Sequence, residues 1–254
     1  MKRAIISDVH SNLEALQTVL EDIQREKVDE IFCLGDVIGY GANPVECIDL
    51  VRANCKVCLL GNHDQGALFD PEGFNDSAEQ AIYWTRSQLE RPHPKQDERW
   101  DFLNERPRSY RDVENGMLFV HGSPRNPLNE YIFPEDIYNP RKLGIQFNLV
   151  TRFSFQGHTH VPGVFSDSSK FYSPEEFSYE KELPSEGKFL INVGSVGQPR
   201  DNDPRACYVI LEKDGPSYIL RYRRLEYPID KAVSKIHAIP QLDKFLGDRL
   251  RAGR

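Results

Sequence analysis

Short apolar runs alternate with amphipathic stretches over the first 64 residues, and this alternation predicts a parallel β-sheet covered by helices. Three apolar runs have the length and β-branched content of buried strands: residues 3–7, 30–36 and 56–64. Two stretches between them place apolar side chains at helical spacing: residues 12–27 and 43–55. Asn12 and Asn43 stand at the expected N-caps, and Pro44 suits a first helical position. The order therefore indicates parallel strands joined by right-handed crossovers.

The rest of the chain departs from this regular alternation. Residues 65–116 predict a helical insertion that covers one side of the fold. Further strands are expected within three segments, followed by a hairpin about an Asp-Gly turn: 117–122, 153–160, 188–201 and 206–227. Residues 166–188 are polar and predict a long loop or an irregular hairpin, and residues 229–254 predict a helical tail. The length favours a single domain over residues 1–254.

The composition narrows the class of protein. A chain of 254 residues with 39% hydrophobic residues can bury a sizeable core, and its net charge of −7 gives no footprint for duplex nucleic acid or an anionic membrane. The N-terminus lacks a signal-peptide apolar region, and no apolar run approaches the roughly 20 residues of a membrane span. We therefore expect a cytoplasmic protein. The five cysteines form no disulfide framework, and Cys55 and Cys58 are expected to be buried thiols because a zinc ribbon needs a second C-x-x-C pair.

Polar side chains follow five of the predicted strands, at the point where each strand ends. The candidate metal ligands are Asp8, His10, Asp36, Asn62, His121, His158 and His160, with His63 beside Asn62. In open α/β sheets, ligands bind outside the carboxyl ends of the strands. Spacing of i, i+2 in an extended segment would put Asp8 and His10 on one side, and His158 and His160 likewise.

Each of these residues alone has an ordinary structural interpretation. A lone histidine is commonly a structural residue, and an aspartate after a strand commonly caps the next helix. Their coincidence at five strand ends instead predicts metal binding. Seven ligands suit two divalent ions that share a carboxylate, and a set without thiolates favours Mn²⁺, with Fe, Zn²⁺ or Ni²⁺ as alternatives.

At this point the chain resembles a known family. The segments "SDVHSN", "GDVIGYG", "GNHD", "VHGSP" and "GHTH" are similar, in order, to the motifs of the calcineurin-like metallophosphoesterases, closest to their small bacterial and archaeal phosphodiesterase branch. The resemblance spans residues 5 to 200 and implies an α/β fold, an αββα four-layer sandwich of two mixed sheets flanked by helices. It also implies one metal held by Asp8, His10, Asp36 and His160, and a second held by Asp36, Asn62, His121 and His158. By the same resemblance His63 would protonate the leaving group and Asp64 would orient His63.

Other residues leave alternatives open. The protein phosphatases of this superfamily read G-D-x-x-D-R-G, whereas "GDVIGYG" lacks the arginine that clamps phosphate, which disfavours phosphoprotein as substrate. Tyr40 in that segment either walls the substrate site or packs structurally. Arg125 and Arg200 follow predicted strands, where they either contact substrate or brace loops. Three aromatic residues of the insertion are expected to lie in the core rather than to form a surface on which a base stacks: Phe74, Tyr83 and Trp84. Ser195 lies outside a G-x-S-x-G motif, which disfavours a serine nucleophile.

Together these features predict a dinuclear metal-dependent phosphoesterase. It would hydrolyse phosphodiester or related phosphoanhydride bonds of a small or nucleotide substrate through hydroxide that bridges the two ions. The alternatives are a phosphomonoesterase or protein phosphatase, and a non-catalytic metal-binding scaffold. No membrane or duplex nucleic-acid partner is expected, and the sequence leaves homo-oligomerisation open.

Overall fold

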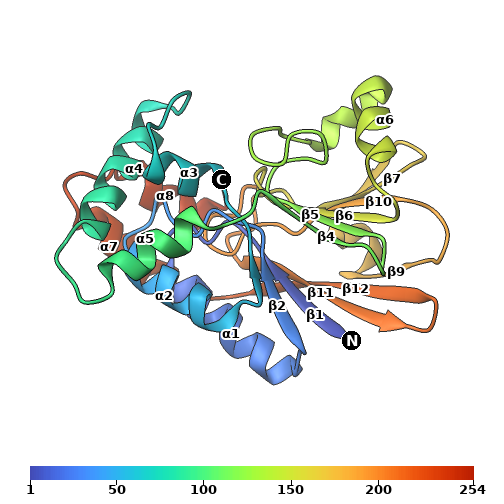
Figure 1. Cartoon of the computed structure of the whole chain (residues 1–254), viewed down its shortest axis with the longest axis horizontal. Helices are drawn as coiled ribbons and strands as arrows, with labels where there is room; N and C mark the ends of the chain where they lie inside the picture. Colours follow the sequence, from blue (N-terminus) through green and yellow to red (C-terminus); the bar gives the residue numbers. More distant parts are fainter.

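Two six-stranded β-sheets pack face to face in the computed structural model, which describes all residues 1–254 (Figure 1). The first sheet has the order β3-β2-β1-β11-β12-β9, with bounds β3 (Val57–Cys58), β2 (Glu30–Cys33), β1 (Lys2–Ile6), β11 (Ala206–Asp214), β12 (Ser217–Leu225) and β9 (Glu180–Leu183). The second has the order β4-β5-β6-β10-β7-β8, with bounds β4 (Ser109–Asp112), β5 (Met117–Val120), β6 (Phe153–Gln156), β10 (Phe189–Asn192), β7 (Gly163–Ser166) and β8 (Lys170–Tyr172). Both sheets mix parallel and antiparallel pairs.

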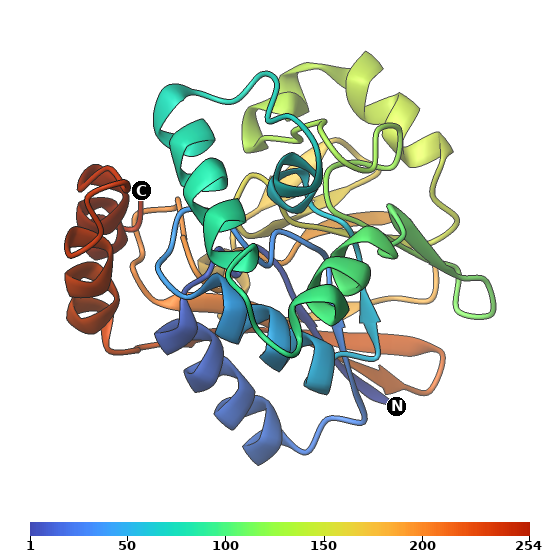
Figure 2. The ribbon, with the colours of Figure 1, turned by 60° about the vertical axis from the view of Figure 1, so that its left-hand side comes forward.

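Eight α-helices and two 3₁₀ turns complete the fold. The helices are α1 (Leu13–Glu26), α2 (Pro44–Asn54), α3 (Asn62–Leu68), α4 (Asp76–Leu89), α5 (Gln96–Asn104), α6 (Pro140–Asn148), α7 (Ile229–His237) and α8 (Phe245–Ala252). The 3₁₀ turns are η1 (Pro134–Tyr138) and η2 (Pro174–Phe177). In Figure 1, α6 lies on the opposite side of the strands from α1 and α2. Figure 2 shows the α7–α8 pair at the edge of the molecule, where α7 contacts α1.

Three apolar clusters hold the four layers together. A 33-residue cluster joins the helices α1, α2, α4, α5, α7 and α8 to the outer face of the first sheet. A 19-residue cluster fills the space between the sheets, and an 8-residue cluster packs α6 on the outer face of the second sheet. Because successive strand residues point to opposite faces, Ile5 of β1 enters the inter-sheet cluster while Ala4 and Ile6 face the helices. The predicted αββα sandwich is therefore confirmed.

The helices begin where the sequence predicts them. The Asn12 side chain accepts a hydrogen bond from the Ala15 N–H at 3.2 Å, and Pro44 occupies the start of α2. The expected helical insertion contains α4 and α5, and Asn75 caps α4 through the Ala78 N–H at 3.0 Å. The expected helical tail contains α7 and α8.

Two expectations about strands need correction. The predicted strand 56–64 ends after Cys58, and Asn62 already lies in the first turn of α3, because the chain must bend away from the sheet edge there. The segment 166–188 is not a plain loop, and only its first residues form a hairpin, in which β7 and β8 pair antiparallel. It also supplies one edge strand of each sheet, β8 and β9. These short strands have little apolar sequence and are defined by their hydrogen bonds to the neighbouring strands.

Every helix of the structure is too short or too polar to cross a lipid bilayer.

Tyr222 links the two sheets, and its removal should weaken the sandwich. From β12 its hydroxyl donates toward the Gly163 and Asn192 carbonyl oxygens of the other sheet, at 3.0 and 2.7 Å, in a fully buried position. We expect Tyr222→Phe to lower the free energy of unfolding by about 1–3 kcal/mol, since it leaves buried acceptors without this donor. Urea denaturation measures the change. Tyr138→Phe, at an 84% exposed tyrosine, is the control, and equal stability of both variants would contradict this role.

Candidate metal centre

The predicted ligands come together at one end of the sandwich, where strand ends of both sheets meet. Asp8 and His10 follow β1, Asp36 follows β2, and Asn62 opens α3. The others come from the second sheet: His121 follows β5, and His158 and His160 follow β6. Apart from half-buried Asn62, each of these side chains is buried. The site thus joins loops whose positions are fixed by two different sheets.

The backbone of these loops is unusual for residues with side chains. Five candidate ligands have positive φ angles in the left-handed region: Asp8 at 55°, His10 at 47°, Asp36 at 52°, His158 at 65° and His160 at 60°. Such conformations are uncommon outside glycine and cost free energy, and they cluster at functional sites. The expected extended i, i+2 geometry is therefore wrong, because tight turns, not strand pleats, aim these pairs inward.

One cluster contains Asp8, His10 and His160. The His10 Nδ1 lies 3.2 Å from the Ile38 carbonyl oxygen, and the His160 Nδ1 lies 2.6 Å from that of Gln198. Because a carbonyl only accepts, each Nδ1 must carry the proton and donate it, which leaves a lone pair on each Nε2. The two Nε2 atoms face each other at 3.2 Å, and Asp8 Oδ1 lies 3.3 Å from the His160 Nε2. Facing lone pairs repel, whereas two nitrogens about 3 Å apart suit a shared ion at about 2.0–2.1 Å.

A second cluster surrounds His121. Its Nε2 lies 3.0 Å from Asn62 Oδ1, 3.1 Å from His158 Nδ1 and 3.4 Å from Asp36 Oδ2. Asp36, His121 and His158 can offer ligand atoms to one point. This mixture of imidazole, carboxylate and amide donors suits a divalent first-row metal.

Asp36 lies between the two clusters. Its Oδ2 is 3.6 Å from the His10 Nε2 and 3.4 Å from the His121 Nε2. Its Oδ1 accepts a hydrogen bond from the backbone N–H of His63 at 2.8 Å. The carboxylate is therefore fixed in a position from which it reaches both groups of imidazoles.

The charges of the site depend on one another. Burial works to raise the pKa of Asp36, but the charges of His121 and His63 outweigh it and hold that pKa well below its usual range. Burial works in the opposite direction on His121, where Asp36 outweighs it and raises the pKa to about 9. Burial, with the charge of His121, lowers the pKa of His158 to about 3. A proton on His121 thus offsets part of the negative charge of the buried carboxylates, and a bound cation would take its place.

Two glycines are required by the close approach of these loops. A side chain at Gly61 would collide with the Asp36 carboxylate, and one at Gly157 would collide with the Asp8 carboxylate. The glycines in "GNHD" and "GHTH" therefore allow the loops to approach the carboxylates.

His63 points toward an open cavity, and Asp64 turns away from it. The His63 ring is buried, its Nδ1 has no hydrogen-bond partner, and burial lowers its pKa to about 4. Asp64 instead accepts hydrogen bonds from the backbone N–H groups of Gly61, at 3.0 Å, and Ile38, at 3.2 Å. The expected contact between Asp64 and His63 is absent because consecutive residues of α3 point in different directions. Asp64 positions the loop that carries the histidine.

The cavity beside His63 has a volume of about 510 Å³. Of the expected substrate contacts, Tyr40 and Arg200 line it, and so does Phe74 from the insertion. Tyr40 also packs against His63 at a ring separation of 4.4 Å. Arg125 does not line this cavity and pairs with Glu130, so the geometry offers it a loop-bracing role.

The remaining candidates do not line this cavity. Trp84 packs against the large helical cluster as expected, whereas Tyr83 is 46% exposed, so its expected place in the core is wrong. The Ser195 hydroxyl is fully buried behind the site, where it donates to the Asp8 carbonyl oxygen at 2.9 Å. Its burial and its hydrogen bond agree with the expectation that it is no nucleophile.

Some neighbours of the site carried no signal in the sequence. Tyr131 stacks on His158 at a ring separation of 3.8 Å, and Arg249 of α8 lines the cavity. The Asn192 amide donates to the Gly157 carbonyl oxygen at 2.7 Å and so holds the loop of "GHTH". Asn192 follows a predicted strand, which is a weak signal, whereas an isolated tyrosine in a loop gives none.

The fold and the site agree with comparisons to known proteins. The sequence model of the calcineurin-like phosphoesterase superfamily domain matches residues 1–215, so the chain belongs to that superfamily. An uncharacterized protein of Methanocaldococcus jannaschii is 40% identical over 261 residues, which cover 99% of this chain and 98% of that protein. The crystal structure of a metallophosphoesterase from Sphaerobacter thermophilus is 37% identical, with a TM-score of 0.83 and coverage of 100% of both chains.

A shorter match points to nucleotide chemistry in a relative. A 67-residue stretch is 33% identical to the symmetrical bis(5'-nucleosyl)-tetraphosphatase of Actinobacillus pleuropneumoniae and covers 25% of each chain. Membership of the superfamily implies a phosphoesterase hydrolase, and the Asp/His clusters are consistent with its need for divalent metal.

Asp36 should be the least replaceable residue of the site. We expect Asp36→Asn to lower the metal content of both clusters, because this carboxylate reaches both, and to reduce hydrolysis by more than the roughly 10–100-fold cost of losing an outer-shell partner. Elemental analysis and circular dichroism measure metal and fold, with Asp97→Asn at an exposed position of α5 as the control. If Asp36→Asn still bound two ions and kept full activity, Asp36 would not be a ligand shared by both ions.

Proposed function

We propose that this chain is a dinuclear metal-dependent phosphoesterase that hydrolyses phosphodiester or related phosphoanhydride bonds of a small or nucleotide substrate. One observation carries the proposal: Asp36 Oδ2 lies 3.6 Å from His10 Nε2 and 3.4 Å from His121 Nε2, between two groups of buried Asp and His side chains, beside a cavity lined by Asn62, His63 and His158. A scaffold would need neither a cavity at the ligands nor a histidine facing it.

The proposed ligand sets follow the two clusters. Asp8, His10, Asp36 and His160 would hold one ion, and Asp36, Asn62, His121 and His158 would hold the other. Divalent ions bound there would supply Lewis-acid chemistry, which polarises phosphate oxygens and activates water. The carbonyl oxygens of Ile38 and Gln198 fix the Nδ1 tautomers of His10 and His160, so that Nε2 of each ring is free to ligate. The nitrogen-rich set favours Mn²⁺, Fe, Zn²⁺ or Ni²⁺ over Mg²⁺.

We assign proton donation to His63. The backbone N–H of His63 donates to Asp36, which fixes the residue, and the ring lines the cavity while its Nδ1 is buried beside Gly39 without a hydrogen-bond partner. A phosphate anion beside the ring supplies the negative charge that favours the protonated imidazole. From there the proton can pass to the departing oxygen of the substrate.

Metal removal tests the proposal directly. Chelation followed by dialysis should abolish hydrolysis of bis(p-nitrophenyl) phosphate, and Mn²⁺ should restore it at least as well as Mg²⁺, because nitrogen ligands favour Mn²⁺. p-Nitrophenyl phosphate is the matched monoester. Undiminished turnover by protein shown to be metal-free by elemental analysis would contradict the proposal. A higher kcat/KM on the monoester would instead identify a phosphomonoesterase.

The role of His63 predicts a dependence on the leaving group. In His63→Ala both ions should remain, and the rate should fall by about 10²–10⁴-fold on an ester with an alkoxide leaving group. The loss should shrink on a p-nitrophenyl ester, because nitrophenolate departs without a proton. His158→Ala should lose metal and fail on both esters. Equal losses on both leaving groups, with one ion missing from His63→Ala, would make His63 a ligand.

A further inference from the structure

Two arginines beside the metal centre pair with no acidic side chain. Arg200 and Arg249 both line the cavity that contains His63 and His158. No aspartate or glutamate pairs with either guanidinium, and Arg249 Nε donates instead to the main-chain oxygen of Arg254, the last residue of the chain. Arg200 Nη2 donates to the side chain of Gln198 at 2.7 Å, and its buried Nε has no partner. The remaining Nη donors of the two guanidinium groups can therefore bind a ligand in the cavity.

The chain holds the two arginines in place although 49 positions separate them. The Asn202 N–H donates to the Gly253 carbonyl oxygen at 2.9 Å, which ties the loop of Arg200 to the end of α8. Arg249 Nε donates to the main-chain oxygen of Arg254. The binding groups are therefore ordered before a ligand arrives, which lowers the entropy cost of binding.

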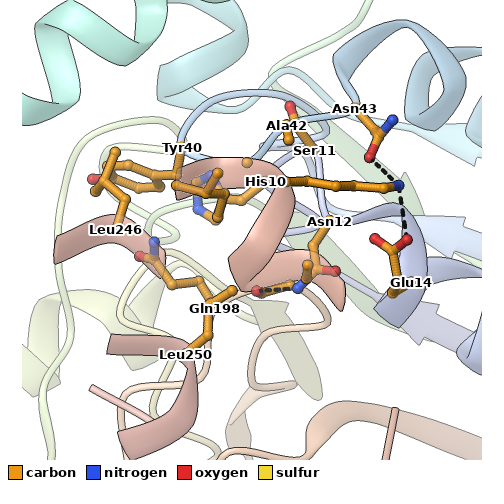
Figure 3. Close-up of a pocket in the computed structure, with 15 residues that line it drawn as sticks. His10, Ser11, Asn12, Glu14, Tyr40, Ala42, Asn43, Gln198, Leu246 and Leu250 are labelled. Carbon is orange, nitrogen blue, oxygen red and sulfur yellow. Dashed lines mark hydrogen bonds and ion pairs between the residues drawn. The ribbon is translucent and has the colours of Figure 1, made fainter. Parts of the chain in front are cut away.

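Helix α8 is also docked on the loops of the metal centre. Leu246 and Leu250 line one small cavity together with Tyr40 and Gln198, and Figure 3 shows Leu246 beside Tyr40. Both leucines are buried. This packing directs Arg249, which precedes Leu250 in the same helix, to the larger cavity.

The pair is electrostatically unfavourable without an anion. Burial, reinforced by the charge of Arg200, lowers the pKa of Arg249 to about 10. Glu72 lies on the exposed rim of the cavity and contacts neither guanidinium. An anion bound between the two arginines would relieve their repulsion and satisfy the free donors.

The cavity continues beyond Arg249. A second hollow of about 470 Å³ shares Tyr40, Asn75 and Arg249 with the first and runs between the start of α4 and α8. Ser77 of α4 donates to Asp243 at 2.7 Å and links the two sides of this hollow. There is room for a substrate that extends past the arginines.

We propose that Arg200 and Arg249 bind a second phosphate group of the substrate, adjacent to the phosphate at the metal centre. The inference rests on the proposed function and narrows it to compounds with a phosphoanhydride linkage, such as nucleoside or dinucleoside polyphosphates. Hydrolysis of a P–O–P linkage consumes one water and yields two phosphate-bearing products, so no other co-reactant is needed. Arg249 lies beyond residues 1–215, the part of the chain that the family model matches.

Binding of paired analogues tests the inference without turnover. Calorimetry on the Mn²⁺-loaded protein would compare α,β-methylene-ADP with AMP, which lacks the second phosphate. The wild-type chain should bind the diphosphate analogue at least about 10-fold more tightly, the effect expected of charge-assisted hydrogen bonds. Arg249→Met should remove most of that difference. Arg251→Met, at an exposed arginine of α8 that pairs with Asp230 at 2.9 Å, should keep it. Equal affinities for the two analogues in the wild-type chain would overturn the inference.

Turnover separates this inference from the proposed function. In Arg249→Met the ratio of kcat/KM for diadenosine tetraphosphate to that for bis(p-nitrophenyl) phosphate should fall about 10-fold or more. If the wild-type chain hydrolysed bis(p-nitrophenyl) phosphate but not diadenosine tetraphosphate, the proposed function would stand and the second phosphate site would be overturned. An equal loss on both substrates would also overturn it, since Arg249 would then act structurally. Failure on every phosphoester would refute both.

Discussion

The lone pairs of buried imidazoles determine the rest of this site. His10 and His160 donate their Nδ1 protons to backbone carbonyls and so direct unprotonated Nε2 atoms at each other, 3.2 Å apart. A cation bound between them would relieve the repulsion of the two lone pairs. The left-handed backbone at Asp8 and Asp36 then has a physical reason, because only tight turns bring side chains from separate strands to one point.

The sandwich supplies the rigid frame that these turns require. Strand ends of the first sheet carry Asp8 and Asp36, and strand ends of the second carry His121 and His158. The apolar cluster between the sheets sets the distance between these two groups of ligands. Outside the sandwich, the insertion and the C-terminal helices supply Phe74 and Arg249 to the cavity, so in the proposed enzyme the residues that would set specificity lie on segments separate from the candidate metal ligands.

Much of this arrangement could be predicted from the sequence, and the limits have physical causes. The convergence of the candidate ligands could be predicted because each follows an apolar run, and strand ends meet at a sheet edge. The turns at His158 and His160 could not, since a left-handed residue outside glycine has no reliable signal. Asp64 contacts the backbone N–H groups of Gly61 and Ile38 and does not contact His63. This could not be predicted, because it depends on the residue at which α3 begins. Tyr131 and Arg249 reach the cavity through tertiary packing alone.

The central claim is that the two Asp/His clusters hold two ions that share one carboxylate. A crystal structure of the Mn²⁺-loaded protein, with anomalous scattering measured at the manganese edge, tests it most directly. The account predicts two anomalous peaks: one among Asp8, His10 and His160, and one among Asn62, His121 and His158. Asp36 should contact both. A single peak, or a cluster that keeps its facing imidazoles with no ion between them, would contradict the account.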